Sequence, residues 1–324
     1  MPEDRALRGR VVLAFAAIYL LWGSTYLGIR YAVETIPPFL MAGTRHLTAG
    51  LILYAWTRSR SNARPKPREW ALAAAIGAMM LLGGNGLVSW AEQRVPSGLA
   101  ALIVASVPLW MTVLEAARLR TAPRAPVIAG LVLGLASLAW LVAPGRSDGA
   151  GRVDALGAGA LLLAALSWAV GSLFSRGVRF SVPTFQAVAM EMIAGGILLW
   201  AVGLATGEGA QLHAGAVSSR SILALGYLVV FGSLAGFSAY MWLLGETTPA
   251  RVSTYAYVNP IVAVLIGWAV AGEALTLRIG LAALGIVGAV AVIIGFGGKR
   301  EKAEAARELV PDVEPVRVSA GRSS

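Results

Sequence analysis

Two stretches of the chain repeat one another and decide its fold. Residues 20–55 read LLWGSTYLGIRYAVETIPPFLMAGTRHLTAGLILYA, and residues 166–201 read LSWAVGSLFSRGVRFSVPTFQAVAMEMIAGGILLWA. Aligned without a gap they share nine identical positions, whereas chance in so biased a composition gives roughly three. The similarity continues at a slightly larger offset, where the proline spacing of residues 96–108 matches that of residues 249–260. The sequence therefore predicts two homologous halves.

The composition points to a membrane protein. Of the 324 residues 57% are hydrophobic and only 14% are charged, and the mean hydropathy is +0.70, whereas about a quarter of the residues of a soluble domain are charged. Cysteine is absent and only two histidines are present, which argues against disulfides, metal sites and cysteine nucleophiles. We expect an all-α integral membrane protein without a cofactor or a metal.

A membrane-spanning helix needs about 20 apolar residues, and the chain contains ten such stretches. They cover residues 11–31, 38–57, 70–90, 97–116, 125–143, 155–175, 183–205, 220–244, 250–271 and 277–297. The first stretch is longer than the core of a signal peptide and no cleavage site follows it, so we expect a retained helix. Five spans in each half place the halves in opposite orientations. The predicted domains are an N-terminus (1–10), a first five-helix repeat (11–145), a second, inverted repeat (155–297) and a disordered tail (298–324).

The formal charge of +10 has a topological explanation. Ten spans put both termini on one side, where the termini and the connectors carry 20 of the 27 Lys and Arg residues, and the opposite side carries 6. Membrane proteins concentrate positive charge on the cytoplasmic side. Both termini are therefore predicted to be cytoplasmic, and the lipid bilayer, not nucleic acid, explains the basic excess. The remaining arginine, Arg45, lies inside a span.

Three short motifs carry a resemblance to a known family: the opening Leu20–Leu27, the second-span Arg45, and Asn259-Pro260 followed by Gly272-Glu273. In this order and spacing they resemble the drug/metabolite transporter superfamily, and within it the ten-helix EamA family of bacterial inner-membrane exporters. The resemblance implies a cavity among spans 1, 3, 4, 6, 8 and 9, with spans 5 and 10 outside. The first half departs from the family, because Glu115-Ala116-Ala117-Arg118 stands where a Gly-Glu pair is usual.

Inverted repeats are the architecture of many secondary transporters, in which the halves rock around a shared site. Together with the resemblance, this predicts a secondary-active exporter of small organic metabolites such as amino acids or drugs, coupled to protons, in the bacterial inner membrane. A gradient-independent facilitator or channel is the alternative, and a membrane sensor or scaffold is a weaker one. An enzyme is not expected, because no cluster of His, Asp and Glu could form an active site.

Charged groups inside the membrane are costly, about 2.5–3.5 kcal/mol each on insertion scales. Arg45, its neighbour His46 and Glu191 lie inside spans, and Arg45 and Glu191 occupy equivalent positions of the two halves. One interpretation is an Arg45–Glu191 ion pair that acts as a gate, with Glu191 or His46 as a proton site. The other is a structural role, either as a permanent pair between the second and seventh spans or with separate local partners for each residue.

Aromatic and amide side chains within the spans suggest a binding site for an organic molecule. The candidates are Trp22, Asn85, Trp168, Tyr240, Tyr257 and Asn259. Trp22 and Trp168 are equivalent in the repeat, and Asn85 belongs to the run Gly83–Gly86 in the third span, which superposes on residues 235–238. Ordinary helix packing is the alternative explanation for these residues. A small-residue motif, Gly130–Gly134, leaves open either a homodimer or packing within the chain.

Overall fold

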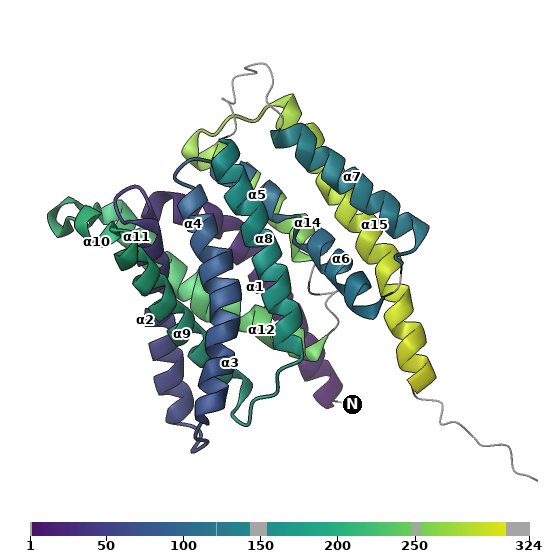
Figure 1. Cartoon of the computed structure of the whole chain (residues 1–324), viewed down its shortest axis with the longest axis horizontal. Coiled ribbons are helices and arrows are strands. Elements are labelled where there is room, and N and C mark those ends of the chain that lie inside the picture. The colour runs from purple at the N-terminus through teal and green to yellow at the C-terminus, as the bar shows by residue number, and fades with distance from the viewer. Residues whose placement is uncertain (1, 121, 143–153, 248–251, 253, 309–324) are drawn as a thin grey trace, which may run out of the picture.

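The structure is a computed structural model that describes residues 2–120, 122–142, 154–247, 252 and 254–308. All regular structure in these ranges is helical (Figure 1). Each of the ten stretches predicted from the sequence coincides with one helix or with a chain of consecutive helices.

In the first half, α1 and α2 are continuous, whereas the third and fourth stretches are each divided. The elements are α1 (Pro2–Ala32), α2 (Pro38–Arg58), α3 (Pro67–Gly77), η1 (Ala78–Gly86), α4 (Leu87–Ala91), α5 (Ser97–Val104), α6 (Val107–Leu119) and α7 (Ala125–Val142). The second half repeats this order with a longer connector after its second helix. Its elements are α8 (Ala155–Arg176), α9 (Thr184–Ala205), α10 (Glu208–Gln211), η2 (Ala214–Ala216), α11 (Ser219–Tyr227), η3 (Leu228–Phe237), α12 (Ser238–Glu246), α14 (Tyr255–Ala271) and α15 (Leu277–Glu308).

Within the described residues, six helices are long and apolar enough to cross a membrane. They are Leu7–Ala32, Pro67–Ala91, Ser97–Leu119, Ala155–Arg176, Thr184–Ala205 and Ser219–Glu246. Three further apolar helices, within α7, α14 and α15, are shorter. The described residues thus form an all-helical structure that is consistent with an integral membrane protein. In Figure 1 the start of α1 and the yellow end of α15 both lie toward the lower edge of the molecule.

The π-helical segments η1 and η3 lie at equivalent places in the two halves. A π-helix has wider turns than an α-helix and is often found at functional sites. Glycines in both segments allow close packing: a Cβ on Gly84 would lie 2.8 Å from Cε3 of Trp168, and one on Gly236 would overlap the indole of Trp22. The predicted superposition of these glycine runs is therefore matched by equivalent contacts in the two halves.

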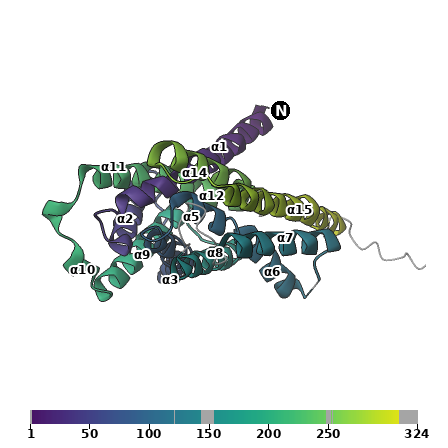
Figure 2. The same cartoon turned by 90° about the horizontal axis from the view of Figure 1, so that it is seen from above.

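Two pairs of equivalent helices pack against each other. α2 packs against α9 through Gly43, Gly50 and Gly196, where an added Cβ would meet the opposite helix. α7 packs against α15 at one end of the molecule (Figures 1 and 2). Gly130 and Gly134 face Ile293, Ala289 and Leu109, so this small-residue face packs within the chain. A homodimer remains a prediction.

Two helix ends also correspond. α14 ends at Gly272 in the left-handed conformation (φ 65°), and α6 ends at Arg120 in the same conformation (φ 50°). The first-half counterpart of the Gly272-Glu273 motif is therefore Arg120 and the residue after it, not the Glu115–Arg118 segment. Thr121, which corresponds to Glu273, lies outside the described residues.

α15 continues to Glu308, beyond the predicted span end at 297. The extension is rich in Ala, Glu, Lys and Arg, which are strong helix formers. The predicted disorder of the tail therefore does not hold for residues 298–308, and residues 309–324 lie outside the described part of the chain.

Candidate functional site

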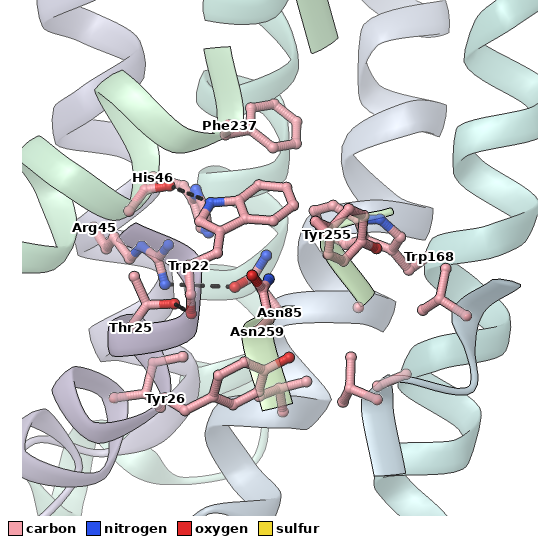
Figure 3. A pocket seen from close by; sticks show the side chains of 17 residues that line it. Trp22, Thr25, Tyr26, Arg45, His46, Asn85, Trp168, Phe237, Tyr255 and Asn259 are labelled. Atoms are coloured by element: carbon pink, nitrogen blue, oxygen red, sulfur yellow. Dashed lines mark hydrogen bonds between the residues drawn. The ribbon is translucent and has the colours of Figure 1, made fainter. Parts of the chain in front are cut away.

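Helices of both halves surround a cavity of about 70 Å³ in the middle of the molecule (Figure 3). We call it the central cavity. It is lined by Trp22, Thr25, Tyr26 and Ile29 of α1, Arg45 and His46 of α2, Gly84, Asn85 and Val88 of η1 and α4, Val104 and Val107 of α5 and α6, Ala164 and Trp168 of α8, Gly232 and Phe237 of η3, and Tyr255 and Asn259 of α14. Six of the nine predicted site residues therefore lie together.

The apolar part of the central cavity is an aromatic wall made of Trp22, Trp168, Tyr255 and Phe237. The repeat-related Trp22 and Trp168 meet edge to face, with ring centroids 5.5 Å apart, and Trp22 meets Tyr255 in the same way at 5.4 Å. Such edge-to-face contacts are favourable for aromatic rings. Equivalent residues of the two halves thus touch at the site.

Hydrogen bonds to neighbouring residues fix the two indoles of the wall. Trp22 Nε1 donates to the carbonyl oxygen of Gly232 at 3.1 Å, and Trp168 Nε1 donates to the hydroxyl of Tyr240 at 3.2 Å. The Tyr240 hydroxyl also pairs with Ser172 Oγ at 2.9 Å. Tyr240, a predicted binding residue, is fully buried and packs behind both indoles, so it orients the wall and does not line the cavity.

The polar part of the central cavity is centred on Arg45, whose exposed fraction is 3%. Arg45 Nε donates to Ser233 Oγ at 2.8 Å, and Arg45 Nη1 donates to Asn85 Oδ1 at 3.4 Å. Ser233 Oγ also lies 3.3 Å from His46 Nδ1, and His46 Nε2 has no hydrogen-bond partner among the described residues. Arg45 and His46 therefore form one hydrogen-bonded group with neutral side chains of η1 and η3.

Asn259 fastens α14 to α1 at the edge of the cavity. With the amide nitrogen turned toward α1, it donates to the carbonyl oxygens of Ile18 (3.1 Å), Tyr19 (3.0 Å) and Tyr255 (3.3 Å). This explains a buried amide in an apolar helix. The side chain of Tyr257, another predicted binding residue, lies outside the part of the structure that is described.

Glu191 lies in a different place from Arg45. It is 1% exposed and lines a second cavity, of about 370 Å³, between the end of α8, the start of α9 and the end of α12. Its Oε2 has no hydrogen-bond partner in the described chain, and the described residues contain no Arg45–Glu191 ion pair. The predicted contact between these two residues is therefore not formed in this structure.

The packing of α2 against α9 explains the separation. The interface uses Gly43 and Gly50 on α2 and the segment from Met192 to Trp200 on α9. Arg45 points from α2 toward η3, whereas the backbone at Glu191 faces Gly77 of α3. Equivalent positions on two antiparallel partners are thus turned toward different neighbours.

The structure also adds lining residues that the sequence did not single out as site candidates. Thr25 and Tyr26 follow Trp22 on α1, and Phe237 on η3 is the repeat counterpart of Asn85. The superposition of the two glycine-containing runs was the signal that could have identified Phe237. Arg45 and His46 were predicted as gating and proton residues, but the resemblance did not include the second span among those that line the cavity, so their place on its lining was not expected.

At one end of the molecule, Glu273 connects α14 to the start of α5. Its carboxylate accepts hydrogen bonds from Ser97 N (2.9 Å), Ser97 Oγ (2.7 Å) and Gly98 N (3.0 Å). Arg30 Nε lies 3.7 Å from Glu273 Oε1. A carboxylate at a helix N-terminus satisfies unpaired N–H groups, so Glu273 holds helices of the two halves together at this end.

Known proteins share this organisation. The model of the EamA-like transporter family matches the chain twice, over residues 9–143 and 155–295. The chain belongs to the EamA-like transporter family. The two matches coincide with the two halves inferred from the internal repeat. Membership in this family marks the chain as a membrane transport protein rather than an enzyme.

The relatives of this EamA-like chain carry transporter names. It is 40% identical over 286 residues to the "Uncharacterized inner membrane transporter YedA" of Escherichia coli K12, covering 88% of this chain and 90% of the relative. It is 25% identical over 296 residues to the "Uncharacterized transporter YvbV" of Bacillus subtilis, covering 91% and 95%. A solved crystal structure with 21% identity matches at a TM-score of 0.64, covering 88% of this chain and 97% of the other, and supports the fold alone.

Proposed function

We propose that this EamA-like protein is a secondary-active exporter of small organic metabolites in the bacterial inner membrane. In this proposal ten helices cross the membrane as two inverted five-helix halves that rock around the central cavity. The observation that carries it is the edge-to-face contact of Trp22 with Trp168. Because these residues are equivalent in the repeat, the cavity lies where the halves meet, as in transporters built from inverted repeats.

The orientation follows from charge. With ten crossings, 20 Lys and Arg residues lie on the side of the termini and 6 on the other, which supports cytoplasmic termini. The chain has no cysteine, so single introduced cysteines can test this arrangement. Ser61→Cys, between α2 and α3, should react with a membrane-impermeant thiol reagent only from the cytoplasmic side. Gly215→Cys, between α10 and α11, should react only from the opposite side.

Two titratable side chains are candidates for proton coupling. His46 lines the central cavity and Glu191 lines the second cavity, and within the described residues His46 Nε2 and Glu191 Oε2 have no hydrogen-bond partner. Histidine exchanges protons near neutral pH when unperturbed. If efflux by the Glu191→Gln variant still responds to a pH gradient, Glu191 is not part of the proton path. The same test applies to His46→Gln.

Transport by purified protein tests the proposal. Proteoliposomes containing the full chain are loaded with pools of amino acids and other metabolites, and efflux is measured with and without an imposed pH gradient. We expect a subset of solutes to leave against their concentration gradient only while the pH gradient persists. Efflux that ignores the gradient would favour a facilitator or channel, and no movement of any solute would contradict transport of this class.

A further inference from the structure

The charge of Arg45 has no anionic partner within ion-pair distance in the described part of the chain. A guanidinium has five N–H donors, and the two hydrogen bonds of Arg45 use Nε and Nη1 on neutral acceptors. A buried charge without a counter-charge is costly. Arg45 is only 3% exposed, so a counter-ion in the cavity would lower the free energy of this arrangement.

The surroundings of the cavity do not supply that counter-ion. None of the lining residues is an Asp or a Glu. The carboxyl group whose charge acts on Arg45 is that of Glu92, which follows α4. Glu92 does not line the cavity and forms no ion pair within 4.0 Å among the described residues. A bound anion would therefore supply the counter-charge that no lining residue places in direct contact with Arg45.

We propose that the central cavity binds an organic carboxylate, whose anionic group pairs with Arg45 and whose apolar body lies against the aromatic wall. Figure 3 shows the geometry: Arg45 and His46 lie to one side of Trp22, and Tyr255 and Trp168 lie to the other. Guanidinium binds carboxylate through two parallel N–H groups. Asn85, already hydrogen-bonded to Arg45, has an amide N–H₂ that can donate to the same group.

The same cavity disfavours a positive ligand group. An ammonium would face Arg45 without any acidic residue on the lining to compensate it. The aromatic faces provide only a weak site for a cation. The cavity therefore selects anions over amines, and an ammonium on the substrate is not required for binding. This inference names the substrate class for the proposed export function and rests on it.

A series of equal-shaped probes tests this selectivity. We suggest acetate, benzoate and 3-phenylpropionate, each with its neutral amide and its amine, and binding to the detergent-solubilised full chain measured by tryptophan fluorescence and calorimetry. At least one carboxylate should bind tenfold or more tightly than its amide and should outcompete its amine. An amide or amine that binds as well as its carboxylate, or a lack of binding by all three carboxylates, would overturn the proposal.

Substitutions assign the selectivity to Arg45. Arg45→Gln should reduce the preference for carboxylate over amide to less than twofold, whereas Trp168→Leu should weaken both probes by similar factors. Arg68→Gln, at an exposed arginine of α3, is the matched control and should leave the preference unchanged. If Arg45→Gln does not fold, the wild-type ranking still decides the question. These binding measurements need no pH gradient. If carboxylate selectivity is absent while transport is intact, only the carboxylate proposal is rejected. If carboxylates bind selectively but no solute is transported, only the export function is rejected.

Discussion

Positions 45 and 191 are equivalent in the two halves, yet they carry opposite charges in different surroundings. Arg45 lies in the central cavity and is held by Ser233 and Asn85 of the π-helical segments. Glu191 lines a separate cavity, and one of its oxygens has no hydrogen-bond partner among the residues that the structure describes. The difference shows that equivalence in the repeat does not make two residues neighbours.

What the halves do share is the packing of helices against one another. Gly50 on α2 faces Ile193 and Met192 of α9, and its counterpart Gly196 faces Leu47 of α2. Gly84 and Gly236 face Trp168 and Trp22 in the same reciprocal way. The symmetric part of the molecule is therefore its helix interfaces, and the asymmetric part is the set of side chains that face the cavities.

The largest effect on transport is expected when the positive charge of Arg45, which the second half does not repeat at position 191, is removed from the central cavity. Arg45→Gln should lower efflux in proteoliposomes by about 100-fold, because Arg45 would no longer pair with the anionic group of the proposed substrate. The loss of one member of such a buried charged pair costs about 2–5 kcal/mol. Arg68→Gln should leave efflux within about twofold of wild type. Efflux by Arg45→Gln close to that of wild type would mean that the charge difference between the halves has no role in transport.

The symmetric part can be tested with equivalent glycines. Gly84→Leu and Gly236→Leu should each lower the free energy of unfolding by about 1–3 kcal/mol, because overpacking forces the facing indole to move. Gly159→Leu, where an added Cβ meets nothing within 4 Å, is the control. Unfolding by denaturant in detergent measures all three. A large loss of unfolding free energy at only one of the two equivalent glycines would contradict the equivalent packing of the two halves.

Glu273 tests the end of the molecule at which a carboxylate of the second half caps α5, a helix of the first half. Glu273→Gln should cost about 1–3 kcal/mol of unfolding free energy, because the amide replaces a charged acceptor of three hydrogen bonds. Glu246→Gln, at an exposed residue at the end of α12, should have almost no effect. Equal stability of the two variants would show that the cap does not hold α14 and α5 together.

The smallest effect concerns the pair that the sequence suggested. If Arg45 and Glu191 do not interact, the effects of Arg45→Gln and Glu191→Gln on the unfolding free energy should add to within about 0.5 kcal/mol in the double variant. A coupling energy well above that value would mean that the two residues meet in a populated state of the protein.

Much of the fold followed from the sequence because helix length and apolar character are local properties. All ten predicted stretches are helical, and the repeat predicted which helices correspond. The π-helical segments could not be predicted, because their wider turns depend on tertiary contacts such as Gly84 with Trp168. The continuation of α15 to Glu308 was missed because charge was taken as a sign of disorder.

The site was predicted in part. Trp22, Trp168, Asn85 and Asn259 lie at one cavity as expected for polar and aromatic residues within apolar spans. The direction in which a residue faces depends on how helices pack, so the sequence could not decide between an Arg45–Glu191 pair and separate local partners. Tyr240 was predicted to line the cavity, but it packs beside the lining residues. Its hydroxyl is hydrogen-bonded to Trp168 and Ser172.

Alternating access to the cavity shared by the two halves is the central claim, and the most direct test is thiol labelling of a single cysteine within it. Ala164 on α8 lines the cavity and is small, so Ala164→Cys is the position of choice in this cysteine-free chain. A membrane-impermeant reagent applied to proteoliposomes should label it from either side, and reversing the pH gradient should shift the ratio of the two labelling rates. Equal labelling from both sides that ignores the gradient would contradict the account and indicate an open channel.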